Sequence, residues 1–147
     1  MYDMIKAQLV ASVPFAKLAH VEVVELADGR AVTRVGEEAE LRNHVGTLHA
    51  AALFLAGETA SGAATAGAFA EMITQVRPLP RTATITYVKG ATSAVTATAK
   101  VEEPPADLRE RLKRDGKAKF VVAVELADAH GESIATMSID WHVSQRA

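Results

Sequence analysis

Apolar and polar residues alternate along much of the second half of the chain. The clearest segment is 135–143, where apolar residues take every second position and Thr, Ser, Asp and His stand between them. Weaker or partial versions of this pattern lie at 82–87, 95–101 and 120–126. Because period-two alternation is typical of antiparallel strands with one buried face, these four segments are predicted to be antiparallel strands.

Two segments in the first half are also strand-like. Residues 21–26 and 31–35 are separated by Asp28-Gly29. An Asp-Gly pair is favoured in a tight hairpin, because both central residues of that turn adopt positive φ. We therefore predict a β-hairpin here, followed by a short edge strand at 37–41.

One long helix is predicted from 47 to about 72, in a segment rich in alanine and other strong helix formers. The segment also holds Gly57, Gly62 and Gly67, although each internal glycine costs about 0.5–1 kcal/mol against alanine. Glycines at this spacing indicate that another element packs closely against the helix. The Arg-Pro-Leu-Pro run at 77–80 is predicted to break the helical segment.

Shorter elements and turns complete the pattern. An amphipathic helix is predicted at 2–12 and ends before Pro14. Residues 104–114 begin with two prolines and then become strongly charged, which predicts a helical turn or a polar excursion. Turns are predicted at 89–93 and 128–131.

The order of these elements predicts the fold class. A parallel sheet needs crossover helices between successive strands, and none is predicted between the last four strands. The length of 147 residues suits one domain with a real core. We therefore predict an α+β protein, a single domain over 1–147 in which an antiparallel sheet wraps around one long central helix.

Composition narrows the classes of function. The chain has 16 Lys and Arg against 18 Asp and Glu, a net charge of −2, whereas nucleic-acid binders usually gather a basic excess on one face. The alanine-rich stretch 50–70 is weakly apolar and contains Glu58, so it is a poor membrane span. With no signal-peptide pattern at the N-terminus, we expect a cytoplasmic protein with neither nucleic-acid nor membrane partners.

Metal and nucleophile motifs are also missing from the sequence. The chain has no Cys, which excludes disulfides, thiolate metal sites and Cys nucleophiles. His44 and His49 are five residues apart at a helix entry, which is poor spacing for a shared metal. No Gly-rich phosphate loop and no G-x-S-x-G motif is present. We expect neither a metal nor an organic cofactor.

The most informative segment is 43–58, Asn-His-Val-Gly-Thr-Leu-His-Ala-Ala-Ala-Leu-Phe-Leu-Ala-Gly-Glu. Gly46 stands three residues before His49, two small residues follow that His, and Glu58 lies nine positions beyond it. In this spacing the chain resembles the hotdog-fold acyl-CoA thioesterases, specifically the phenylacetate-type group. The resemblance implies a hotdog fold and hydrolysis of an acyl-CoA thioester to free acid and coenzyme A. Ala50 and Ala51 stand where that group usually has two glycines.

The resemblance also suggests roles for individual residues. It makes the Ala50 N–H the donor to the oxyanion, at a helix N-terminus where free N–H groups and partial positive charge stabilise an anion by roughly 3–4 kcal/mol per donor. Asn43 would position water or the carbonyl. Glu58 would either activate water or attack the thioester directly. For His49, a part in catalysis and a simple helix-capping role stay equally open.

Other residues are candidates for contacting the substrate. Relatives often use a hydroxyl just after the acidic residue, and basic groups could bind the phosphates of coenzyme A, although charge runs such as 109–119 are usually solvated loops. The candidates are Gly46, Thr59, Ser61, Gly62, Lys89, Lys113 and Arg114.

Helix geometry adds a constraint on the subunit arrangement. Ala50 and Glu58 are eight residues apart, about 12 Å along a helix that rises 1.5 Å per residue. One thioester carbon cannot contact both within one subunit, so a shared site needs Glu58 from a neighbouring subunit, as in hotdog dimers. We therefore predict a homodimer with two composite sites, and a dimer of dimers stays open.

Two other functions stay open. The alanines in place of glycines favour a noncatalytic acyl-CoA-binding or partner-binding hotdog module. Hotdog hydratases and dehydratases pair a carboxylate with a His a few residues later, a pattern that Glu38 and His44 imitate weakly. Release of free thiol from acyl-CoA, or hydration of crotonyl-CoA, separates these functions.

Overall fold

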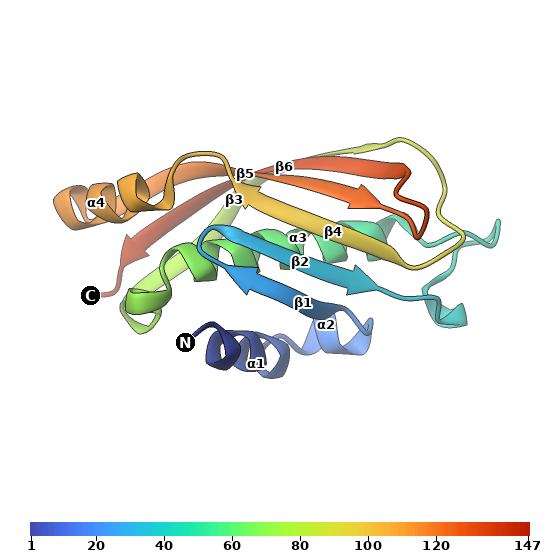
Figure 1. The fold of residues 1–147 in the computed structure, drawn as a ribbon, viewed down its shortest axis with the longest axis horizontal. Coiled ribbons are helices and arrows are strands. Elements are labelled where there is room, and N and C mark those ends of the chain that lie inside the picture. The colour runs from blue at the N-terminus through green and yellow to red at the C-terminus, as the bar shows by residue number, and fades with distance from the viewer.

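One antiparallel sheet curves around a central helix in the computed structural model, which describes residues 1–147 (Figure 1). This confirms the predicted α+β architecture. The strands are β1 (Glu22–Ala27), β2 (Arg30–Val35), β3 (Val76–Tyr87), β4 (Val95–Val101), β5 (Lys117–Ala127) and β6 (Ser133–Gln145).

The strands lie in the order β1-β2-β4-β5-β6-β3, and every neighbouring pair is antiparallel. β1 and β3 are therefore the two edges of the sheet. The predicted hairpin is confirmed, since Ala27 pairs with Arg30. Its turn differs from the predicted one, because Gly29 takes a positive φ of +73° and Asp28 does not. No helix is both long enough and apolar enough to cross a membrane.

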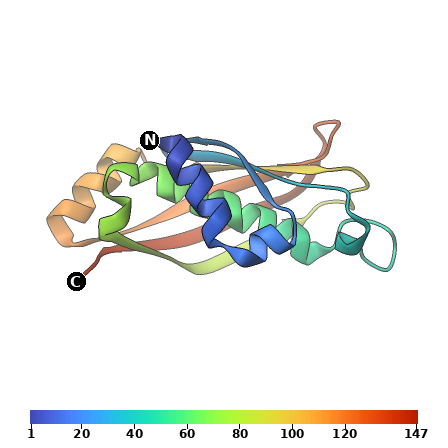
Figure 2. The same cartoon turned by 90° about the horizontal axis from the view of Figure 1, so that it is seen from below.

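Four α-helices accompany the sheet. The central helix packs mainly on β2, β4 and β5, and the first helix lies against β1 and against the central helix (Figure 2). The helices are α1 (Tyr2–Ser12), α2 (Pro14–Leu18), α3 (Ala50–Ala68) and α4 (Pro105–Asp115), with short 3₁₀ helices η1 (Ala39–Leu41) and η2 (Ala70–Gln75).

The core lies between α3 and the inner face of the sheet. The alternation predicted for the last strand is confirmed, since its apolar positions from Ala135 to Val143 are all buried. On α3 the inward positions are mostly alanine, with Ala56, Ala60 and Ala64 fully enclosed. Small side chains on the helix let the sheet curl closely around it, which accounts for the alanine-rich composition of this segment.

Two glycines of α3 confirm the predicted close packing. A Cβ built on Gly67 would overlap the backbone carbonyl oxygen of Ala27 at the end of β1, and a Cβ on Gly57 would overlap the Sδ of Met137 on β6. The backbone of α3 therefore touches its neighbours where any side chain would interfere.

The central helix is shorter than predicted. It begins at Ala50 because the side chain of His49 caps it, and the preceding loop bends through Gly46 at φ +84°. It ends at Ala68, since Phe69 leaves helical geometry with φ −114°, and η2 follows in place of a last α-helical turn.

Three other local predictions were wrong or incomplete. Residues 37–41 do not form an edge strand, because β1 already closes that side of the sheet; they contain η1 instead. The run at 77–80 does lie beyond the helical segment, but it belongs to β3, where an edge position tolerates Pro78 and Pro80. Residues 105–115 are the full helix α4, and α2 follows α1 with Pro14 at its first position.

Candidate active site

The loop before α3 is shaped by the side chain of Asn43. Its Oδ1 accepts hydrogen bonds from the backbone N–H groups of Val45 (3.0 Å) and Thr47 (3.1 Å), and its Nδ2 donates to the Thr47 hydroxyl at 2.8 Å. The carboxamide oxygen is thus fully engaged within the loop. One N–H of Asn43 has no protein partner, and it is the part of this side chain that can still meet a ligand.

His49 caps the N-terminus of α3, as one of the two sequence interpretations had it. Its Nδ1 accepts from the Ala51 N–H at 2.9 Å, and its carbonyl accepts from the N–H groups of Ala52 and Leu53. An Nδ1 that accepts a hydrogen bond leaves the proton of the neutral ring on Nε2. A catalytic part for this imidazole stays a prediction.

These caps leave one amide of the first helical turn free. The Ala50 N–H donates no hydrogen bond within the protein, and Ala50 is exposed. A free N–H at the start of a 19-residue helix carries the partial positive charge of the helix end. The carbonyl of Ala50 accepts from the Tyr87 hydroxyl at 3.3 Å, which ties the helix start to the end of β3.

Glu58 lies two turns further along α3 and is half-buried. Burial raises the pKa of its carboxyl above the ordinary value of 4.5. The side chain lines a cavity of about 560 Å³ between α1, α3 and the first half of β3, together with Thr59 and Gly62. We call this space the Glu58 cavity.

Thr59 and Gly62 shape the wall beside the carboxylate. The Thr59 hydroxyl is buried without a hydrogen-bond partner, although helical threonines commonly bond to a carbonyl one turn back. The hydroxyl oxygen is enclosed by the protein, although Thr59 itself lines the cavity. A Cβ on Gly62 would lie 3.4 Å from Cη2 of Trp141, so the glycine leaves the space above the indole ring open.

Ser61 points away from this cavity into the core. Its side chain is fully enclosed; the hydroxyl donates to the carbonyl of Glu58 at 2.7 Å and accepts from Nε1 of Trp141 at 3.1 Å. The structure thus groups Glu58 with Thr59 and Gly62, while Ser61 joins their turn of the helix to β6.

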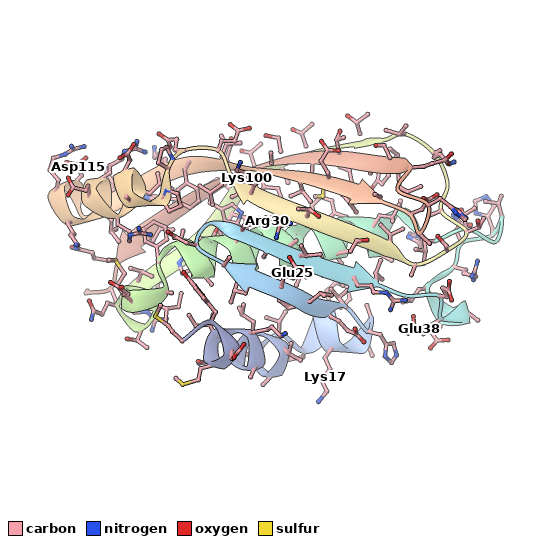
Figure 3. All side chains as sticks on the ribbon, in the orientation of Figure 1. Lys17, Glu25, Arg30, Glu38, Lys100 and Asp115 are labelled. Atoms are coloured by element: carbon pink, nitrogen blue, oxygen red, sulfur yellow. The ribbon has the colours of Figure 1, made fainter.

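The basic candidates lie at opposite ends of the molecule. Lys89 follows β3, pairs with Glu132, and sits in the loop that bonds to the start of α3 through Ala91 and Leu48. Lys113 and Arg114 lie in the last turn of α4, beside Asp115. Figure 3 shows Asp115 at the opposite end of the molecule from Glu38, the residue that precedes η1. Within one subunit, these two groups cannot contact the same phosphate.

Part of the basic run around α4 has structural partners. Arg109 donates to the Ala68 carbonyl at the end of α3 (2.8 Å) and to Asp28 (2.9 Å). Arg111 makes a two-pronged pair with Glu103. Lys113 makes no salt bridge or side-chain hydrogen bond and is exposed, so it is the most available cation of this helix.

The sequence analysis missed the residues that complete the Glu58 cavity. Ile5 and Leu9 of α1, and Val76 and Pro78 of β3, form its apolar walls. The amphipathic pattern of α1 was visible in the sequence, but nothing local told which element its apolar face would cover. No group of three or more His, Cys, Asp or Glu side chains is close enough to hold a metal ion.

The architecture, a single antiparallel sheet wrapped around a central α3, is that of the hotdog fold, and comparison with solved structures agrees. The Pseudomonas aeruginosa protein PA5026, described as a probable thioesterase, matches with a TM-score of 0.86 and 20% identity over 99% of this chain and 97% of its own. The Escherichia coli PaaI protein of the phenylacetic acid degradation operon matches with 0.72 and 18% over 99% and 94%. The Staphylococcus aureus thioesterase SAV0944 matches with 0.73 and 20% over 90% and 99%.

The predicted hotdog fold is thereby confirmed. More narrowly, residues 2–143 match DUF4442, a family described as a domain of unknown function, and the chain belongs to that family. A comparison with curated proteins finds no match.

Proposed function

We propose that the protein is an acyl-CoA thioesterase that hydrolyses its substrate at a site shared between two subunits. The observation that carries this proposal is that one helix presents both groups: a free N–H at Ala50, and two turns later the desolvated Glu58 carboxylate at an apolar cavity. The first suits a developing oxyanion and the second suits proton transfer. Two of the similar structures are described as thioesterases, which agrees with this chemistry.

The proposed reaction needs no group beyond these two and a water molecule. Glu58 takes a proton from a water molecule while the oxygen of that water attacks the thioester carbon. The Ala50 N–H stabilises the resulting oxyanion. Collapse of the tetrahedral intermediate breaks the C–S bond, and the protonated Glu58 returns its proton to the coenzyme A thiolate. A raised pKa helps the carboxyl to hold the proton between these steps. Direct attack by Glu58 through a mixed anhydride is the second form of the proposal.

The edge strand β3 supports the proposed homodimer. It has twelve residues, of which nine are exposed, and its outer edge carries unpaired backbone groups. Long uncovered edges of this kind promote association with another chain. β3 ends at Tyr87, whose hydroxyl donates to the carbonyl of Ala50, and its first half lines the Glu58 cavity. A partner chain that pairs along β3 would therefore lie near both Ala50 and Glu58.

A panel of acyl-CoAs assayed for free thiol release tests the activity. Glu58→Gln should abolish turnover, and Ala50→Pro should lower kcat by about 100-fold, the effect of losing one oxyanion donor. Proline is tolerated at the first helical position, and His49 already has the φ of −62° and ψ of 140° that a residue before proline adopts. Ala50→Ser keeps the N–H and is the matched control.

Mixed dimers test the shared site. A dimer of one Ala50→Pro chain and one Glu58→Gln chain contains one doubly defective site and one intact site if the two groups act across the interface. It should recover about half of the wild-type rate. If each subunit holds a complete site, every site carries one defect and no activity returns.

The alternative function is a noncatalytic module that binds acyl-CoA. The exposed methyl groups of Ala50 and Ala51 at the proposed oxyanion site favour it, because they narrow the approach to the amide. Saturable binding of acyl-CoA to the wild-type protein, with no thiol release from any substrate in the panel, would establish the module and exclude the hydrolase.

A further inference from the structure

Three elements line the Glu58 cavity, and each presents one regular face to it. α3 contributes positions 58, 59, 62, 63 and 66, a stripe of about 12 Å at 1.5 Å per residue. β3 contributes the alternate positions 76, 78 and 80, about 13 Å of strand. α1 contributes 5, 8, 9 and 12, about 10 Å of helix. Because the lining residues of α3 span this length, the cavity extends for about 12 Å along the helix, and we call it a channel.

The walls of this channel are mostly apolar. The α3 wall carries the small residues Gly62, Ala63 and Ala66, which project little into the channel. Ile5 and Leu9 line it from α1. At the end near the C-terminus of α3, Arg146 donates from Nε to the Val76 carbonyl at 3.0 Å. The channel thus has the Glu58 carboxylate and Arg146 among its lining residues, with these apolar side chains on its α1 and α3 walls, while Gln8, Ser12 and Thr74 add polar groups.

We infer that this channel holds the acyl chain of the substrate, that the substrates are straight aliphatic acyl thioesters of medium length, and that Leu9 on α1 is a determinant of chain length. This inference rests on the proposed function. It assigns the acyl group to the same subunit that supplies Glu58, while the partner supplies the oxyanion donor.

Shape and size favour a straight chain over an aromatic acyl group. A volume of about 560 Å³ lies within the range of small-molecule sites. A benzoyl or phenylacetyl group is much shorter than the channel and would leave its far half empty, without the contacts that an extended chain makes with Leu9 and Ala66. Carbons beyond Arg146 would meet water and contribute nothing more.

The first test is the dependence of kcat/KM on chain length for butyryl-, hexanoyl-, octanoyl-, decanoyl-, lauroyl- and palmitoyl-CoA. In the wild-type protein kcat/KM should rise by about fourfold per buried methylene, then level off at medium length. Phenylacetyl- and benzoyl-CoA should fall below decanoyl-CoA. A flat profile, or aromatic substrates that exceed decanoyl-CoA, would overturn the inference.

The second test uses a matched pair on α1. Leu9→Trp fills the channel and should lower the ratio of decanoyl-CoA to butyryl-CoA activity by about tenfold. Val10→Trp adds the same ring to the neighbouring position, which is 41% exposed and does not line the channel; it should keep the wild-type profile. Equal profiles for the two variants, with circular dichroism showing both folded, would remove Leu9 from chain selection.

Equilibrium binding separates the failure of this inference from the failure of the proposed function. Decanoate should bind the wild-type protein and the Val10→Trp variant alike in calorimetry, and the Leu9→Trp variant about tenfold more weakly. Leu9-dependent binding without thiol release would keep the channel and exclude the hydrolase. Hydrolysis that does not respond to Leu9 would keep the hydrolase and exclude the channel. If decanoate does not bind and no acyl-CoA is hydrolysed, both the acyl channel and the hydrolase are excluded.

Discussion

The indole Nε1–H of Trp141 on β6 donates a hydrogen bond of 3.1 Å to the hydroxyl of Ser61 on α3. The same hydroxyl donates to the carbonyl of Glu58 at 2.7 Å. The sheet is thus joined, through one buried serine, to the helical turn that carries the proposed catalytic carboxylate. The position of Glu58 therefore depends on residues far from it in sequence.

Replacing Ser61 by Ala should destabilise the protein by about 1–3 kcal/mol, because the indole N–H of Trp141 would stay buried without an acceptor. Urea unfolding followed by tryptophan fluorescence measures the loss. Ser138→Ala, at an exposed position of the same strand as Trp141, is the control and should stay within about 0.5 kcal/mol of the wild type. Similar losses for the two variants would contradict a special role for the Ser61 bond.

The pH dependence of turnover should report the raised pKa of Glu58. The carboxylate form is the active one, so kcat should fall as pH decreases through a value above 4.5. A stopped thiol assay across the acidic range measures this limb. An inflection at or below 4.5 would show that burial does not act on this group in the working enzyme.

Glu58 should also make stability depend on pH. Because its pKa is higher in the folded state, the folded protein holds the proton more tightly, and stability is lost as pH rises from 4.5 through the raised value. Glu58→Gln stays uncharged and should therefore be more stable than the wild type at neutral pH. The difference should shrink below 4.5, which thermal unfolding at several pH values can check.

Two glycines of α3 should respond in opposite ways to substitution by alanine. Gly67→Ala places a Cβ against the carbonyl oxygen of Ala27 and should cost about 1–3 kcal/mol. Gly62→Ala meets only Trp141 at 3.4 Å and should stabilise the protein by up to about 1 kcal/mol, since alanine favours the helix. Chemical unfolding compares the two variants. The reverse order would show that the contact between α3 and the end of β1 is not close in solution.

The end of α4 offers a test of phosphate binding. If Lys113 and Arg114 bind the phosphates of coenzyme A, changing both to Glu should raise KM for an acyl-CoA by about fivefold, the effect of about 1 kcal/mol. The KM for a short thioester without the nucleotide should change little. Equal changes for the two substrates would remove these residues from coenzyme A binding.

Sequence patterns predicted the features that depend on neighbouring residues. The strand alternation of β6, the Asp28-Gly29 turn and the helix start near His49 are local, because each follows from side-chain period, backbone φ or capping within a few positions. The motif from Gly46 to Glu58 belongs to the same class. Through this motif the chain resembles the hotdog-fold thioesterases, and the resemblance implied the hotdog fold.

Other features depended on contacts between distant segments. Pro78 was predicted to be part of a helix break, yet it lies in β3, because an edge strand tolerates residues without an N–H. Ser61 was a substrate candidate, yet Trp141 draws its hydroxyl into the core. Leu9 belongs to the apolar face of α1, and the sequence did not indicate which element that face covers. In the structure it lines the Glu58 cavity beside α3.

Local order in this chain was thus encoded by residues close together in sequence, through backbone preferences and hydrophobic period. The tertiary structure alone decided three other features, since each depends on how the sheet closes around α3. These are the strand that forms the edge, the hydroxyl that is hydrogen-bonded in the core, and the element that faces Glu58. The physical reason is that burial and hydrogen-bond pairing are properties of several elements packed together, and no short segment contains them.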